Sequence, residues 1–200
     1  GTVGGVDVVE VVEDGAEILH ILKSPVEAEV VQGRIDWGRR FDHMQQHTGQ
    51  HVLSQAFVEV LGGETRSFHL GADVSTLEIG IAAASDDDLE RVERRANRAV
   101  FENLPVRTSF VPSERIPLRR PPKVEGPVRV VEVDGFDWSA CGGTHVGRTG
   151  EIGLIKVLSA ERIRGNLRFT FVCGWRALAA FQSRNRVVRD LVGRFNVPDR

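Results

Sequence analysis

The stretch that decides the fold is RRFDHMQQHTGQHVLSQAFVEVLGG, residues 39–63. Its apolar side chains recur three and four residues apart, as on one face of a helix. They are Phe41, Met44, Val52, Leu53, Ala56, Phe57, Val60 and Leu61. Gly62 and Gly63 follow, and glycine is common just past the end of a helix. The sequence therefore predicts a helix over residues 39–61, with one face buried in a core.

On the carboxyl side of this helix, β-rich runs alternate with amphipathic stretches. The expected strands are 65–71, 74–82, 106–112, 128–134, 153–163 and 166–173. A second helix is expected from 86 to about 103 and a third from Trp175 to about 195, within the usual boundary error. Residues 138–151 are rich in glycine and are expected to be irregular. Interleaved helices and hairpins predict an α+β domain with a mainly antiparallel sheet packed with helices.

On the amino side, residues 6–12 and 17–22 are apolar and flank Asp14-Gly15, which predicts a hairpin. Another short strand is expected within 27–36. Three parts are expected along the chain: a small, truncated β domain over 1–37, a main domain over 38–182, and a C-terminal helix end over 183–200 that leads to a missing segment.

Composition narrows the class of protein. Hydrophobic residues make up 41% of the chain, enough for a core, and no apolar run is long enough to span a bilayer. Two cysteines are too few for a disulfide framework, which favours a reducing, cytoplasmic location. The net charge of −2 argues against a strongly basic nucleic-acid binder. Residues 1–38 hold eight acids and two bases, however, so the remainder carries +4.

Two pairs of side chains have the spacing of metal ligands. His47 and His51 lie four apart on the predicted helix, so both imidazoles share one face. Cys141 and His145 are also four apart, ninety residues after His51, with glycines between them that allow a sharp turn. Mixed nitrogen and sulfur ligands suit zinc. His43 lies four before His47, so spacing alone leaves His43–His47 open as the helical pair, and otherwise His43 packs, faces solvent or contacts a substrate.

The stretches DWGRRFDHMQQHTGQHVLSQAF (36–57) and CGGTHVGRTGEIGLIKVLS (141–159) closely resemble the editing domain of alanyl-tRNA synthetases. They look most like the free-standing alanyl-tRNA editing proteins of the AlaX type. The resemblance implies an α+β editing fold preceded by a small β-barrel. It implies one zinc per chain, held by His47, His51, Cys141 and His145. Free-standing members usually carry a segment that contains Gly-Gly-Gln, before the point that corresponds to the start of this sequence. No such segment is found here.

The implied activity is hydrolysis of the ester that joins a wrong amino acid, chiefly serine with glycine as a second candidate, to alanine tRNA. Two alternatives are the editing piece of a full synthetase and a zinc-stapled RNA-binding module without catalysis. Four protein ligands close a tetrahedron, so the sequence leaves open whether zinc activates water or positions the substrate.

The sequence suggests residues that would contact the amino acid of this substrate and residues that would contact its tRNA. Thr48 and Gln50 lie inside the histidine motif and are candidates to recognise a serine hydroxyl, although Thr48 could instead bond its own backbone. Phosphates of the tRNA would bind basic side chains. The candidates are Arg115, Arg119, Arg120 and Lys123, then Arg162, Arg164 and Arg168. Taken singly, each of these charges could equally be a solvated surface residue.

Overall fold

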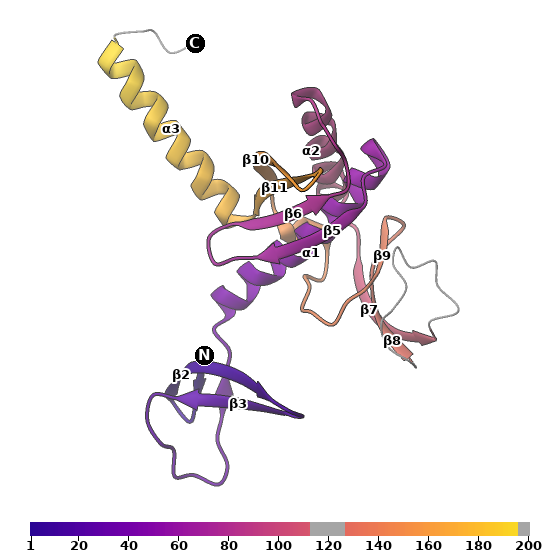
Figure 1. Ribbon diagram of the computed structural model, residues 1–200. Coiled ribbons are helices and arrows are strands. Elements are labelled where there is room, and N and C mark those ends of the chain that lie inside the picture. The colour runs from indigo at the N-terminus through magenta and orange to yellow at the C-terminus, as the bar shows by residue number, and fades with distance from the viewer. Residues whose placement is uncertain (113–126, 196–200) are drawn as a thin grey trace. The chain divides into compact units, whose positions relative to one another are not determined.

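A computed structural model describes residues 1–112 and 127–195 of the chain. The chain divides into two compact units, Gly1–Phe41 and Asp42–Arg200. Over the described residues it contains three α-helices and three antiparallel sheets (Figure 1). The predicted α+β class is therefore confirmed.

The first unit is an open four-stranded sheet with the order β3-β2-β1-β4. Its strands are β1 (Thr2–Val3), β2 (Val6–Asp14), β3 (Glu17–Leu22) and β4 (Gly33–Arg34). The predicted hairpin is present, with Gly15 at φ +60° in its turn, while the strand expected within 27–36 shrinks to two residues. Within residues 1–41 the strands do not close into a barrel, as expected of an incomplete β-barrel unit, and two of the four strands are only two residues long.

The second unit carries two further sheets, and all their strand pairs are antiparallel. One has the order β10-β11-β6-β5, made of β5 (Thr65–Leu70), β6 (Ser75–Ile79), β10 (Ile155–Ile163) and β11 (Asn166–Cys173). The other has the order β7-β8-β9, made of β7 (Val106–Pro112), β8 (Pro127–Val133) and β9 (Asp137–Ala140). A short 3-10 helix, η2 (Thr149–Ile152), precedes β10.

The helices are α1 (Trp37–Leu61), α2 (Asp86–Phe101) and α3 (Trp175–Phe195). Ser85 caps α2 through a reciprocal capping box with Asp88, as the acidic start of that helix predicted. α3 is exposed along most of its length, and Ala177 is its one buried residue in the described part. None of the described helices has the length and apolarity needed to cross a membrane.

α1 is the element that positions the site, and it is fixed to the sheet by apolar and polar contacts. Phe57 is fully buried and packs on Phe169 of β11, with ring centroids 4.5 Å apart. The buried amide of Gln46 accepts from the Cys173 N–H at 2.8 Å and donates to the Cys173 carbonyl at 3.1 Å. Asp42 binds Arg176 of α3 through both carboxylate oxygens, at 2.8 and 2.6 Å. These contacts determine which face of α1 is turned away from the sheet.

Gly49 permits α1 to approach β11 closely. A Cβ placed at Gly49 would overlap Cys173 Sγ and lie 3.3 Å from Cγ2 of Ile152. Both neighbours are fully buried, so neither can move into solvent. Only glycine fits there without displacing the core.

Gly49→Ala is expected to destabilise the chain by about 1–2 kcal/mol, because overpacking of about 1–3 kcal/mol is partly offset by better helix propensity. The penalty should shrink by about 1 kcal/mol in a Cys173→Ala background, which removes the overlapping sulfur. Urea unfolding of the four proteins in this double-mutant cycle measures the coupling. If Gly49→Ala lowers the free energy of unfolding by the same amount in both backgrounds, overlap with the Cys173 sulfur is not the reason that glycine is needed.

Candidate metal centre

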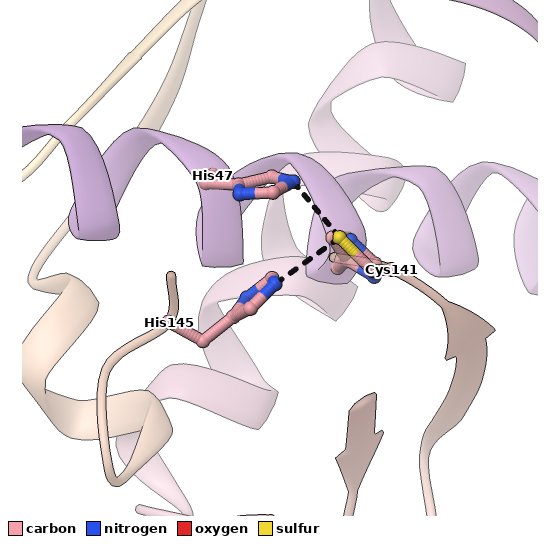
Figure 2. A group of neighbouring side chains, drawn as sticks. His47, Cys141 and His145 are labelled. Atoms are coloured by element: carbon pink, nitrogen blue, oxygen red, sulfur yellow. Dashed lines mark hydrogen bonds between the residues drawn. The ribbon is translucent and has the colours of Figure 1, made fainter. Parts of the chain in front are cut away.

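Four side chains from two distant segments meet beside α1. His47 and His51 come from α1, while Cys141 and His145 come from the loop after β9. One donor atom from each of the four lies within 4.8 Å of every other. Cys141 Sγ lies 3.4 Å from His47 Nε2 and 3.4 Å from His145 Nε2 (Figure 2). The structure thus brings together all four residues whose spacing suggested a metal site.

The donor set and its dimensions fit zinc. With Zn–S of about 2.3 Å and Zn–N of about 2.0–2.1 Å, a tetrahedral site has S···N edges of about 3.5 Å. Both sulfur–nitrogen distances at Cys141 match that edge. Three imidazoles and one thiol are nitrogen and sulfur ligands of the kind that zinc takes.

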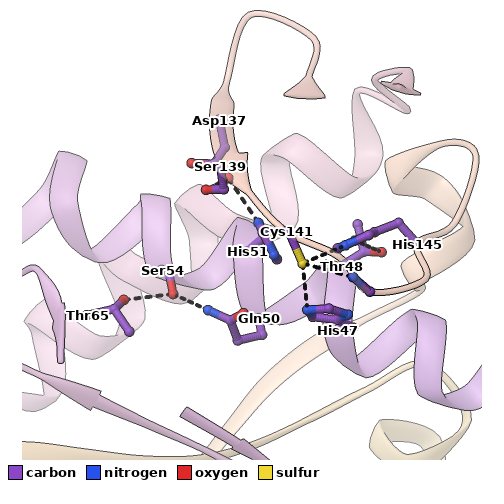
Figure 3. Close-up of polar contacts among 11 residues, drawn as sticks. His47, Thr48, Gln50, His51, Ser54, Thr65, Asp137, Ser139, Cys141 and His145 are labelled. Carbon is purple, nitrogen blue, oxygen red and sulfur yellow. Dashed lines mark hydrogen bonds and ion pairs between the residues drawn. The ribbon is translucent and has the colours of Figure 1, made fainter. Parts of the chain in front are cut away.

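His51 is oriented by two residues of β9. Its Nδ1 lies 3.2 Å from Oδ2 of Asp137, and the Ser139 hydroxyl donates to the same oxygen at 2.8 Å (Figure 3). Burial alone would lower the pKa of His51, but the hydrogen bond and charge of Asp137, with smaller contributions from Cys141, raise it. A carboxylate on the far nitrogen fixes the tautomer that leaves Nε2 free to bind a metal.

Thr48 orients His145 in a similar way. Its Oγ1 lies 3.2 Å from His145 Nδ1 and accepts the Val146 N–H at 3.2 Å. Thr48 is fully buried. Its hydroxyl therefore ties α1 to the loop and keeps Nε2 of His145 directed at Cys141.

For two of the four side chains, the pKa is shifted toward the protonation state that metal ligation requires. Burial would raise the pKa of Cys141, but hydrogen bonds from His145, His47 and His51 lower it to about 3. Burial lowers the pKa of His145 to about 4, with the charges of His51 and His47 adding to the effect. At neutral pH these two side chains are a thiolate and a neutral imidazole, the forms that bind metal.

The glycine loop packs tightly against His47. A Cβ at Gly143 would overlap the His47 ring, so glycine is required for this approach. The Gly143 N–H also points at Cys141 Sγ, at 3.4 Å. The two glycines predicted to allow a sharp turn therefore differ, because Gly142 has open space beside it and Gly143 has none.

Three of the four candidate ligands are partly exposed to solvent. His51 is only 5% exposed, whereas His47, Cys141 and His145 are partly exposed. Phe68 of β5, 50% exposed, lies beside His47 with ring centroids 6.1 Å apart. Three of the four candidate ligands and Phe68 therefore present some surface to solvent.

The other candidate substrate contacts occupy different positions. His43 is partly exposed and lies outside the four-residue cluster, so the structure favours His47–His51 as the helical pair. Gln50 is buried, and its amide donates to Ser54 Oγ at 2.7 Å, which also accepts from Thr65 at 2.8 Å (Figure 3). The amide nitrogen of Gln50 is therefore engaged within the core.

The candidate tRNA contacts are only partly described. Arg115, Arg119, Arg120 and Lys123 lie outside the described residues. Arg162 and Arg164 are exposed at the β10–β11 turn, where Arg164 has a φ of +47°. Arg168 on β11 pairs with Glu161 at 3.6 Å. The two exposed arginines are accessible to a phosphate.

Asp137 and Ser139 support the site but were not predicted to do so. The signal was present, because side chains two residues apart in a strand lie on one face, and Asp137, Ser139 and Cys141 follow that spacing. This alternation was missed because residues 138–151 were predicted to be irregular, although the first of them belong to β9.

Asp137→Ala is expected to weaken zinc binding about 10–100-fold, because residues that orient metal ligands typically contribute that much. Competition with a chromophoric chelator measures the affinity. Asp134→Ala is the matched control, since Asp134 lies in the adjacent turn and pairs only with the exposed Arg107 among the described contacts. Equal zinc affinity in the two variants would contradict the role of Asp137.

Comparison with known proteins relates this chain to alanyl-tRNA editing proteins and to alanine--tRNA ligases. Residues 128–169 match the family described as Threonyl and Alanyl tRNA synthetase second additional domain. The chain is 34% identical to Alanyl-tRNA editing protein Aarsd1-A of Xenopus laevis, over 89% of this chain and 45% of that protein. It is 35% identical to Alanyl-tRNA editing protein AlaX-L of Pyrococcus horikoshii, over 92% and 47%. An Alanine--tRNA ligase of Pyrococcus furiosus is 37% identical, over 92% and 22%. The chain thus spans about half the length of the editing proteins it matches.

Proposed function

The chain is a homologue of the alanyl-tRNA editing proteins, and on that premise we propose that it hydrolyses the ester joining a wrong amino acid to alanine tRNA, chiefly serine and secondarily glycine. The observation that carries the proposal is the Cys-His₃ cluster, three of whose four side chains are partly exposed. Four protein ligands alone would also fit a structural zinc site, so it is the partial exposure of three of them that favours access for a substrate. The tRNA is the proposed partner, and its phosphates would meet the arginines at the β10–β11 turn.

Zinc is the proposed cofactor, one per chain, and when bound it supplies a Lewis acid that can activate water or polarise a carbonyl. The residues of the chain prepare the site for it. Asp137 and Thr48 hold His51 and His145 with their Nε2 atoms inward, and Cys141 supplies the negative charge. Because an aminoacyl ester is already reactive, holding it in place also accelerates its hydrolysis.

The proposed enzyme must hydrolyse the seryl ester and leave the correct alanyl ester intact. A site that hydrogen-bonds a hydroxyl rejects an analogue lacking it strongly, so serine can be separated from alanine. Thr48 and Gln50 are the proposed contacts within the histidine motif, but both are buried and already bonded in the structure. The Thr48 hydroxyl bonds His145 Nδ1 and the Val146 N–H, and the Gln50 amide nitrogen bonds Ser54, so Thr48 would act on the substrate through His145. His43, outside the cluster and partly exposed, is the remaining proposed contact.

The activity is tested by measuring hydrolysis of seryl-, glycyl- and alanyl-tRNA for alanine by the zinc-loaded chain. The seryl ester should be hydrolysed well above its spontaneous rate, and the alanyl ester should be spared. A chain that binds this tRNA without hydrolysing any of the esters would instead be an RNA-binding module. Relatives include both editing proteins and ligases, and the proposed reaction is the same whether the chain is free-standing or part of a ligase.

A further inference from the structure

Arg129 of β8 contacts the metal-binding loop at three points. Its backbone carbonyl accepts the N–H of Cys141 at 3.1 Å. Its guanidinium Nη1 donates to the carbonyl of Cys141 at 2.6 Å and to the carbonyl of Gly143 at 2.9 Å. One side chain therefore clamps both ends of the Cys141–Gly143 turn onto the sheet.

This clamp determines the geometry at two of the four candidate ligands. By holding the Gly143 carbonyl, Arg129 directs the Gly143 N–H toward Cys141 Sγ, where it lies at 3.4 Å. The same turn presses Gly143 against the His47 ring, with no room for a Cβ between them. Movement of the turn would therefore shift the sulfur and release His47 together.

The surroundings of Arg129 suggest that its role is specific to this loop. Among the described residues, its side chain donates to these two carbonyls and pairs with no carboxylate. Arg107, on the neighbouring strand β7, has the ordinary arrangement of a surface cation: it is exposed and pairs with Asp134 at 3.0 Å. A partly buried guanidinium that donates to two carbonyls of one short turn holds the shape of that turn.

We propose that Arg129 is a positioning residue of the metal centre, which shapes the Cys141–Gly143 turn so that the thiolate and the His47 imidazole converge on one ion. The inference rests on the zinc site proposed above. It concerns binding of the ion and is independent of which ester, if any, the chain hydrolyses.

The test replaces Arg129 by methionine, which keeps an unbranched stem and removes the donors. Zinc affinity is measured by competition with a chromophoric chelator, and Arg129→Met is expected to weaken it about 10–100-fold, as for other residues that orient ligands. Arg107→Met is the matched control, because it removes a neighbouring positive charge without touching the loop, and its zinc affinity should equal that of the wild type.

A second readout separates positioning from loss of folding. Cobalt(II) is bound in place of zinc, and its thiolate charge-transfer absorption reports the sulfur–metal contact directly. In Arg129→Met this absorption should fall or shift at saturating cobalt, while circular dichroism shows the same secondary structure as the wild type. A variant with unchanged zinc affinity and an unchanged cobalt spectrum would overturn the inference. A wild-type chain that binds neither metal would instead refute the zinc site itself.

Discussion

Cys141→Ala is expected to lower zinc affinity by more than the roughly 100-fold typical of supporting residues, and to abolish zinc-dependent ester hydrolysis. Cys141 Sγ lies at the centre of the contacts, 3.4 Å from both His47 Nε2 and His145 Nε2. With a pKa lowered to about 3, it is also the anionic ligand at neutral pH. Alanine would leave three imidazoles and no anionic sulfur ligand, a weaker set for a divalent cation. Elemental analysis and a deacylation assay on the same preparation measure both effects.

The chain provides its own control in Cys173. This thiol is fully buried against α1, burial raises its pKa, and it lies outside the cluster. Cys173→Ala should keep one zinc per chain although it removes a thiol from the core. Loss of zinc from Cys173→Ala, or its retention by Cys141→Ala, would contradict the assigned ligand.

Removal of the metal is expected to have the second large effect, on the free energy of unfolding. A ligand that binds only the folded state stabilises it by about 4 kcal/mol when its free concentration is 1,000 times Kd. The ligands here come from α1 and from a loop ninety residues further on, so the ion would join two segments that the unfolded chain separates. Urea unfolding at buffered zinc and in excess chelator measures the difference.

Cys141→Ala should show little of this stabilisation at the same free zinc concentration, which makes it the control for nonspecific metal effects. A wild-type unfolding midpoint that is unchanged by chelation would mean that the four residues do not form a metal site in the folded chain.

The sequence predicted the regular elements well where periodicity was strong. β7 and α3 have the predicted bounds, and α1 begins two residues early, at Trp37. β9 was missed because it is only four residues long and adjoins a glycine-rich stretch. The strand expected within 27–36 is reduced to β4, because its sheet partner β1 offers only two residues. Strand length depends on the partner, which periodicity within one segment does not reveal.

Residue types and spacing predicted the four candidate ligands, but not the contacts that bring them together and orient them. Spacing of four indicates which side chains share a helix face, yet His43 and His51 are both four from His47. The choice between them depends on where the loop carrying Cys141 meets α1, a contact between distant segments. The roles of Asp137 and Arg129 depend on that same contact. Spacing of two along the strand links Asp137 to Cys141. Spacing could not assign Arg129, because its contact with the loop depends on the pairing of β8 with β9.

X-ray absorption at the zinc edge of the purified, zinc-loaded chain tests the central claim most directly, because it counts sulfur and nitrogen ligands around the ion. We predict one sulfur at about 2.3 Å and three imidazole nitrogens at about 2.0–2.1 Å, with one zinc per chain. A shell without sulfur, or a well-folded chain that retains no zinc under these conditions, would contradict the assignment of His47, His51, Cys141 and His145 as the metal centre.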